Sequence, residues 1–255
     1  ERGNEMRKII IAGNWKMHKT NEEAEKLARG LLEVVKPRDN VKMVLCPPFT
    51  ALERVSKVIE GSFIELGAQN LFYEKEGAYT GEISPLMLKS VGCRYVIIGH
   101  SERRKYFKET DELINRKIRS AIQEGLIPIF CVGETLEERE RGKAQVVVER
   151  QVREGLKDID REGEVVIAYE PVWAIGTGKN ATPQQAEEVH VFIREWISNK
   201  YLQDIAKNLI ILYGGSVKPE NIKALMAEDD IDGVLVGGAS LIADSFIKIM
   251  CYGVR

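Results

Sequence analysis

The chain has 255 residues, and its composition excludes several broad classes of protein. Lysine and arginine total 37 against 39 aspartate and glutamate, so the formal net charge of −2 lacks the basic surplus of a nucleic-acid-binding domain. No apolar run approaches the roughly 18 residues that a membrane-spanning helix needs. A hydrophobic fraction of 44% supports a sizeable core.

Apolar, β-branched runs alternate with amphipathic stretches along the chain. Strands are expected to begin near Lys8, Val41, Ile64, Tyr95, Ile127, Val165, Leu209 and Gly233. Helices are expected from Thr20 to Val35, from Thr50 onward, and over Ser84–Gly92, Asp111–Glu124, Ala144–Leu156, Thr182–Ser198 and Ser240–Met250. Strict alternation implies parallel strands, and eight units close a single-domain (β/α)8 barrel. A doubly wound open sheet is the alternative fold.

Three helix starts have a recognisable signature. Thr20 is followed three residues later by Glu23, Thr50 by Glu53, and Thr182 by Gln185, with Pro183 at the first helical position. A threonine that accepts from the third residue of a helix, and a glutamate or glutamine that reaches back, form a capping box. We therefore expect helices to begin at these three threonines.

The cysteines and the amino terminus indicate a reducing compartment. None of the cysteines forms a C-x-x-C pair, so free thiols and a cytoplasmic location are expected for Cys46, Cys93, Cys131 and Cys251. Residues 1–6 are charged and do not resemble a signal peptide. We interpret them as a tag, linker or fusion remnant ahead of a catalytic domain over 7–255. The 30% of charged residues hints at a heat-tolerant source.

Two connections are unusually long. The first, residues 69–83, carries Leu71, Phe72, Tyr73 and Tyr79. Aromatic side chains on a protruding loop favour docking into a partner, although the loop could instead fold back on its own surface. The second follows Glu170, where Pro171 ends the strand and a small, glycine-rich run suits a mobile cover.

Residues capable of chemistry follow several of the predicted strands. Asn14 and Lys16 come after the first, His100 and Glu102 after the fourth, and Glu170 after the sixth. In a barrel the carboxyl ends of all strands lie on one face, so these side chains are expected to converge there. Each taken alone also fits an ordinary role, as a solvated lysine, a buried histidine or a capping glutamate.

Glycine turns follow the last two strands. Tyr213-Gly214-Gly215-Ser216 and Gly237-Gly238 would let backbone N–H groups approach an anion, and barrels often bind phosphate there. Plain tight turns are the other interpretation. No histidine or cysteine spacing fits a metal site, and we expect neither metal nor cofactor. Gly178-Lys179 lacks the flanking residues of a nucleotide-binding P-loop.

Five motifs, occurring in order from about Arg7 to the end of the chain, resemble triosephosphate isomerase. They are A-G-N-W-K at 12–16, G-H-S-E-R-R at 99–104, A-Y-E-P-V-W-A-I-G-T-G-K at 168–179, Y-G-G-S-V at 213–217 and V-G-G-A-S at 236–240. Asn180, which follows the glycine-rich run, departs from the family pattern.

The resemblance implies a TIM barrel that interconverts dihydroxyacetone phosphate and D-glyceraldehyde 3-phosphate, a step of glycolysis and gluconeogenesis. Glu170 would be the base, a neutral His100 would polarise the carbonyl, and Lys16 and Asn14 would stabilise the enediolate. Glu102 would orient Lys16. The residues implied to hold the phosphate are Gly176, Ser216, Gly237 and Gly238, and Asn14 and Lys16 would also bind the substrate. The segment 171–179 would close as a lid.

The resemblance also implies a homodimer, sometimes a tetramer, formed through the loop 69–83. Thr80 near its tip would reach Asn14 and Lys16 of the neighbouring subunit. Two other functions stay open at this point. One is an aldolase that uses Lys16 as a Schiff base, and the other is a non-catalytic barrel kept for binding.

Overall fold

The computed structural model is a closed barrel of parallel strands in which every strand pairs with its neighbours in chain order. It describes residues 7–159, 165–174, 181–201 and 203–253, with the side chains of 203 and 204 excepted. In these ranges the strands are β1 (Ile9–Asn14), β2 (Val41–Cys46), β3 (Ile64–Ala68), β4 (Cys93–Ile98), β5 (Ile127–Val132), β6 (Val166–Tyr169), β7 (Ile210–Tyr213) and β8 (Gly233–Val236). The ring closes where β1 pairs with β8, with Ile10 opposite Gly233.

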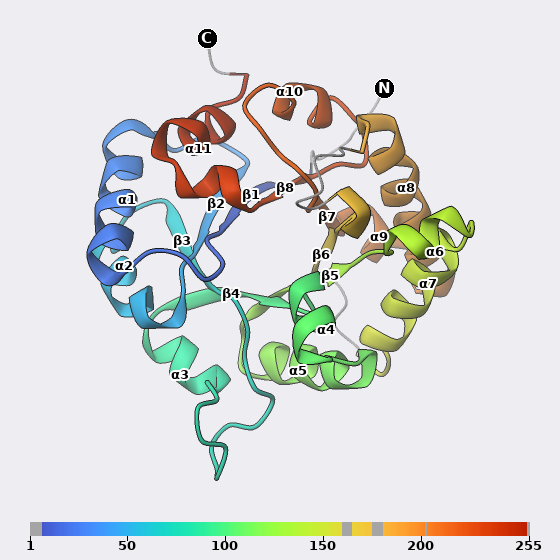
Figure 1. Ribbon diagram of the computed structural model, residues 1–255, viewed down its shortest axis with the longest axis horizontal. Helices are drawn as coiled ribbons and strands as arrows, with labels where there is room; N and C mark the ends of the chain where they lie inside the picture. Colours follow the sequence, from blue (N-terminus) through green and yellow to red (C-terminus); the bar gives the residue numbers. More distant parts are fainter. Residues whose placement is uncertain (1–6, 160–164, 175–180, 202, 254–255) are drawn as a thin grey trace.

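Helices surround the strands as an outer ring, as Figure 1 shows. They are α1 (Asn21–Val34), α2 (Leu52–Ile59), α3 (Pro85–Ser90), α4 (Ser101–Phe107), α5 (Asp111–Gln123), α6 (Leu136–Glu140), α7 (Ala144–Gly155), α8 (Pro183–Lys200), α9 (Gln203–Asn208), α10 (Ile222–Leu225) and α11 (Ala243–Met250). The expected single-domain TIM barrel is therefore confirmed, and the open sheet is wrong. None of the helices in the described part of the chain is long and apolar enough to cross a membrane.

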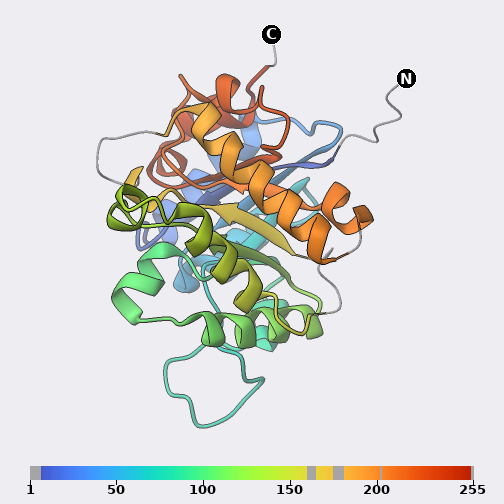
Figure 2. The ribbon, with the colours of Figure 1, turned by 90° about the vertical axis from the view of Figure 1, so that its right-hand side faces the viewer.

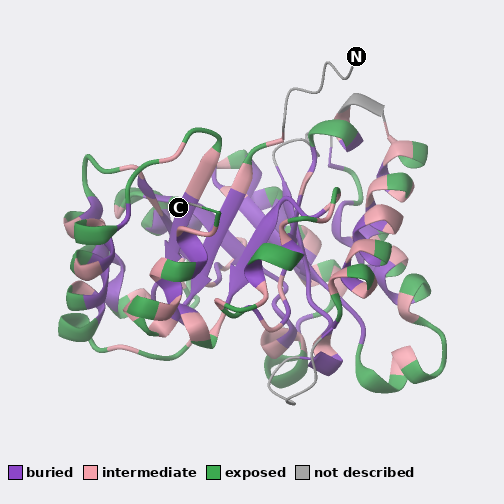
Figure 3. Ribbon diagram, turned by 90° about the horizontal axis from the view of Figure 1, so that it is seen from above, coloured by how far each residue is buried: buried purple, intermediate pink, exposed green. Residues whose placement is uncertain are grey.

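The core has two layers because successive strand residues point to opposite faces. Inside the barrel, side chains of alternate residues pack together: Ile10, Ala12, Val44, Cys46, Tyr95, Ile97, Ile129, Cys131, Val166, Ala168, Leu212 and Leu235. Their neighbours, such as Ile11 and Phe130, pack outward against the helices. Figure 3 shows this arrangement as buried strands inside helices with exposed outer faces. The filled interior leaves the strand ends as the place for a site.

Two of the three predicted capping boxes are confirmed. Thr20 caps α1 with Glu23, and Thr182 caps α8 with Gln185 and with Pro183 at the first position. The box at Thr50 is wrong. A 3-10 turn over Phe49–Ala51 already includes Thr50, so its backbone is helical instead of extended, and α2 begins at Leu52 behind Ala51.

The last predicted helix begins later than expected. A 3-10 turn over Gly238–Leu241 comes first, and α11 starts at Ala243. The cysteines of the described chain are free thiols as expected. Cys46, Cys93 and Cys131 are buried, and Cys251 is half-buried.

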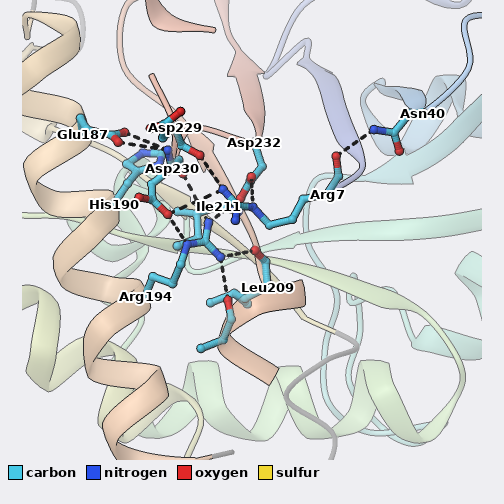
Figure 4. A network of polar contacts seen from close by, with 11 residues as sticks. Arg7, Asn40, Glu187, His190, Arg194, Leu209, Ile211, Asp229, Asp230 and Asp232 are labelled. Carbon is cyan, nitrogen blue, oxygen red and sulfur yellow. Dashed lines mark hydrogen bonds and ion pairs between the residues drawn. The ribbon is translucent and has the colours of Figure 1, made fainter. Parts of the chain in front are cut away.

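A network of charged groups joins α8 to the loop before β8 and to the start of β1 (Figure 4). Arg194 forms ion pairs with Asp230 and, at 2.7 Å, with Asp232, and Arg7 lies 2.5 Å from the other Asp232 oxygen. Asp232 is only 5% exposed, and it also accepts from the Ile211 N–H at 2.9 Å. A buried carboxylate needs such a set of donors. The network therefore joins the start of β1, the start of β8 and α8 where the ring of strands closes.

His190 of α8 lies beside this network and is fully buried. Its Nδ1 is 3.0 Å from the Asp230 carbonyl oxygen, and its ring packs edge-on to Tyr169 with centroids 5.9 Å apart. Burial lowers the pKa of His190 from 6.5 to about 4. The ring is therefore neutral in the fold, and its contacts give it a structural role.

This buried histidine predicts a loss of stability in mild acid. His190 of the unfolded chain binds a proton as pH falls below 6.5, whereas His190 of the folded chain binds it only near pH 4. The free energy of unfolding therefore falls as pH falls from 6.5 to about 4. The total loss is about 3 kcal/mol at 1.36 kcal/mol per pKa unit. Denaturant titrations between pH 7 and 4 should show a shallower pH dependence in His190→Asn than in the parent chain.

The matched control is Val189→Ala, since Val189 is the buried neighbour of His190 on α8 and does not titrate. It should lower the free energy of unfolding by the same amount at every pH. Equal slopes for the parent and His190→Asn would mean that another group is responsible.

Candidate active site

The carboxyl ends of the strands surround one cavity of about 750 Å3. Its walls contain residues from elements far apart in the sequence: Asn14, Lys16, His100, Glu102, Glu170, Ser216, Gly237 and Gly238. These are the site residues that the sequence singled out, and the structure brings them together. The remaining one, Gly176, lies outside the described residues, as do Asn180 and most of the segment interpreted as a lid.

Glu170 directly follows β6 and is 2% exposed. Its carboxylate accepts from the Ser101 N–H at 2.9 Å and from the Ser101 hydroxyl at 3.1 Å, and it lies 3.0 Å from His100 Nε2. Burial raises the pKa of Glu170, but His100 and the two Ser101 donors outweigh burial and the net pKa is lowered. The carboxylate is therefore ionised in this conformation, and a general base must be ionised to accept a proton.

His100 caps the start of α4, and its two ring nitrogens have different partners. Nδ1 accepts from the Glu102 N–H at 3.2 Å, while Nε2 faces Glu170. An accepting Nδ1 carries no proton, so the neutral ring with its proton on Nε2 satisfies both contacts. Burial lowers the pKa of His100, but the charge and hydrogen bond of Glu170, together with the charge of Glu102, outweigh burial, so the net pKa is raised while His100 and Glu170 touch.

Lys16 is held in an unusual backbone conformation. Its φ of 53° is left-handed, which is costly for a residue with a side chain. Asn14 Oδ1 accepts from the Lys16 N–H at 3.0 Å, and Gln69 Nε2 donates to the Lys16 carbonyl at 2.8 Å. The ammonium forms an ion pair with Glu102 at 2.7 Å. Asn14, Gln69 and Glu102 therefore set where the Lys16 charge lies.

Glycines line the side of the cavity that follows β7 and β8. A Cβ on Gly215 would come within 2.2 Å of the Tyr213 hydroxyl, and one on Gly237 within 3.3 Å of Lys16 Cε. A Cβ on Gly238 would meet nothing within 4 Å. Gly238 also opens the 3-10 turn, whose first N–H groups lack partners within the turn. This backbone suits an anion, as the glycine pattern predicted.

Sequence reasoning missed two polar residues at the site. Ser101, which binds Glu170 twice, sits in the G-H-S-E-R-R motif directly after His100, and its position at the start of a helix was the available signal. Glu134 is fully buried behind Glu170, accepting from the Tyr169 hydroxyl at 3.1 Å, Trp173 Nε1 at 2.9 Å and Arg139 Nη1 at 2.9 Å. It joins the end of β5 to the start of the segment after Glu170.

No cluster of three or more His, Cys, Asp or Glu side chains able to hold a metal ion occurs in the part of the chain that the structure describes.

Known proteins resemble this chain over nearly its whole length. A family model described as triosephosphate isomerase matches residues 9–252. The triosephosphate isomerase of Caldanaerobacter subterraneus is 59% identical over 249 residues, which cover 97% of this chain and 100% of the relative. That of Carboxydothermus hydrogenoformans is 59% identical over 96% of this chain and 98% of the relative. The triosephosphate isomerase of Dictyoglomus thermophilum is 56% identical over 96% of this chain and 99% of the relative.

The two Ser101 donors predict how the charge on Glu170 responds to mutation. Ser101→Ala removes the hydroxyl that helps to lower the pKa of Glu170, so that pKa should rise, because a hydrogen bond to the charged carboxylate stabilises its ionised form. A 13C NMR titration of the Glu170 carboxyl measures this directly. Ser120→Ala removes a buried hydroxyl on α5 and should leave the titration unchanged. An unshifted curve in Ser101→Ala would show that the hydroxyl does not stabilise the charge.

Proposed function

The chain belongs to the triosephosphate isomerase family, and we propose how its own residues carry out the reaction of that family. The protein is an isomerase that interconverts dihydroxyacetone phosphate and D-glyceraldehyde 3-phosphate. The observation that carries our proposal is that an ionised, buried Glu170 contacts His100 at 3.0 Å in a cavity that Lys16 also lines. A base, a proton donor and a cation are the groups that proton transfer beside a carbonyl needs.

We propose that Glu170 takes a proton from the carbon beside the substrate carbonyl. In the conformation described here its oxygens are bonded to Ser101 and His100, so the side chain must first turn toward the cavity. Gly214 of the cavity wall lies close to the Glu170 side chain, since a Cβ on Gly214 would be 3.0 Å from Glu170 Cγ. The absence of a side chain at Gly214 leaves Glu170 the space to turn. The electron pair of the broken C–H bond becomes the enediolate double bond, while the carbonyl pair moves to oxygen. Glu170 then gives the proton to the adjacent carbon, where the double-bond pair forms the new C–H bond and a carbonyl reforms on the neighbouring oxygen.

His100 and Lys16 would stabilise the negative charge that forms on oxygen. The Nε2–H of a neutral His100 donates to the carbonyl oxygen once Glu170 has turned away, and it shuttles protons between the two oxygens. The Lys16 ammonium and the Asn14 amide stabilise the enediolate. Glu102 forms an ion pair with the Lys16 nitrogen at 2.7 Å, so this nitrogen is engaged by a carboxylate and is not placed as the free nucleophile of a Schiff-base aldolase.

The phosphate would bind on the glycine side of the cavity. Ser216 supplies a hydroxyl, and the backbone N–H groups around Gly237 and Gly238 point donors at the anion. Gly176 and the segment 171–179 would close over it, because an enediolate beside a phosphate is lost if water enters. No cofactor is needed for this chemistry. The free thiols support a reducing compartment, and we propose the cytoplasm.

Glu170→Gln tests the assignment of the base. It keeps the shape of the side chain and removes the charge, so kcat in a coupled isomerase assay should fall by about 10²- to 10⁴-fold, with KM little changed. Glu112→Gln, an exposed position on α5, is the control and should keep full activity. Full activity in Glu170→Gln would remove Glu170 from the chemistry.

We further propose that two copies of the chain associate through the loop 69–83. This loop projects beyond the helices below α5 (Figure 2), where Tyr79 is 43% exposed. Its root lies beside Lys16 through the Gln69 bond, and Met17, the next residue, is 94% exposed. Leu86 and Met87 of α3 are also exposed. Such a set of apolar side chains favours a protein interface, and Thr80 of one subunit would reach Asn14 and Lys16 of the other.

Removal of Phe72 to Tyr79 should therefore give a soluble monomer with little activity, measured by sedimentation velocity and the coupled assay. The point change Met17→Asp buries a charge in the proposed interface and should have the same effect. Val146→Asp, at an apolar position of α7 that is 65% exposed, is the control and should leave the dimer intact. A fully active monomer would contradict the proposal.

A further inference from the structure

A buried glutamine on α7, Gln151, forms hydrogen bonds with the backbone of Gly133, in the segment that contacts the Glu170 backbone. Gln151 is 5% exposed and shares the inner face of the helix with the buried side chains Val148 and Val152. Its Oε1 accepts from the Gly133 N–H at 2.7 Å, and its Nε2 donates to the Gly133 carbonyl at 3.2 Å. The side-chain amide therefore pairs with both polar groups of one residue, in the way that a neighbouring strand would.

On the other side of Gly133, its two chain neighbours accept hydrogen bonds from the segment that carries Glu170. The Glu170 N–H donates to the Val132 carbonyl at 2.7 Å, and the Val172 N–H donates to the Glu134 carbonyl at 3.1 Å. A Cβ on Gly133 would lie 1.7 Å from the Glu170 carbonyl oxygen, so only glycine permits this approach. Residues 132–134 therefore lie between Gln151 and the segment that carries Glu170.

Packing alone does not fix Gly133. A cavity of about 570 Å3 borders Val132, Gly133 and Gln151 and extends to Ser101 and Glu170. A close-packed interior would resist a shift of the Gly133 peptide, but an adjoining cavity leaves room for one. The two hydrogen bonds from Gln151 are then the contacts that set the position of this peptide on the α7 side.

We propose that Gln151 is a positioning residue of the isomerase reaction. It holds the Gly133 peptide in place and thereby fixes the position of the Glu170 backbone relative to the substrate. The inference rests on the proposed role of Glu170 as the base. Misplacing a catalytic group by about 1 Å can cost on the order of 100-fold in rate. An amide is suited to this task because it donates and accepts at once, whereas leucine does neither and an ionised glutamate cannot donate.

Gln151→Leu tests the proposal with a side chain of similar size. We expect kcat to fall by about 10- to 100-fold with KM within about threefold, measured well below the melting temperature. Asn115→Leu is the matched control. Asn115 of α5 donates to the Gly155 and Lys157 carbonyls at 3.0 and 2.8 Å, so it also holds backbone at α7, but at the end remote from the cavity. It should lower the melting temperature and leave kcat unchanged.

Gln151→Glu supplies a second readout that does not depend on Gln151→Leu folding. An ionised carboxylate repels the Gly133 carbonyl, while its protonated form donates to that carbonyl and restores both bonds. The position is 5% exposed, and burial raises the pKa of a glutamate from its ordinary value of about 4.3 by up to several units. The introduced carboxyl should therefore gain its proton as pH falls from about 9 to 6, and the kcat of this variant relative to the parent should rise severalfold. A purely structural glutamine would leave this ratio flat wherever circular dichroism shows both proteins folded.

Equal kcat in Gln151→Leu and Asn115→Leu, or a flat ratio in Gln151→Glu, would overturn the proposal. The Glu170→Gln assay separates this failure from a wider one. If Glu170→Gln is inactive while the Gln151 variants behave like the control, only the positioning role fails. If Glu170→Gln is fully active, the assignment of the base fails first.

Discussion

Glu170 is a negatively charged residue that is only 2% exposed, and the hydrogen bonds around its carboxylate follow from that burial. A desolvated carboxylate costs several kcal/mol unless donors replace the lost water. Here the donors are the backbone and hydroxyl of Ser101 and the ring of His100. The same contacts keep the proposed base ionised and keep it away from substrate, so catalysis requires Glu170 to exchange these partners for the reacting carbon.

That exchange requires the Glu170 side chain to move while its backbone stays in place. The backbone of Glu170 and Val172 donates hydrogen bonds to Val132 and Glu134, at the carboxyl end of β5. Arg104 joins β4 to β5 by donating to the carbonyls of Gly99 at 2.8 Å and Cys131 at 3.2 Å. Val132 accepts from Glu170, and the Glu134 side chain gathers Tyr169, Trp173 and Arg139. Strand ends fixed in this way allow a side-chain rotation without displacing the strand.

The sequence predicted the barrel and the residues around its mouth because both depend on local signals. Strand periodicity placed Asn14 and Glu170 at strand ends, and parallel closure then brought them to one face. The error at Thr50 arose because a turn begun at Pro48 overrode the local capping pattern, with the Ala51 N–H donating to the Pro48 carbonyl. The Gln151 contact gave no local signal, since its partner Gly133 is 18 residues away and its geometry exists only once α7 packs on β5.

The backbone of Lys16 suggests why assembly and activity would be coupled in the proposed dimer. A non-glycine residue with φ of 53° persists only where its surroundings hold it, at a cost on the order of 1–3 kcal/mol. One of its supports is Gln69, which donates to the Lys16 carbonyl and, at 2.9 Å, to that of Cys46. Gln69 is also the first residue of the loop 69–83. A partner that fixes this loop would therefore hold Gln69, and through it the Lys16 ammonium proposed to face the substrate, whereas a free loop would let the strained lysine relax out of place.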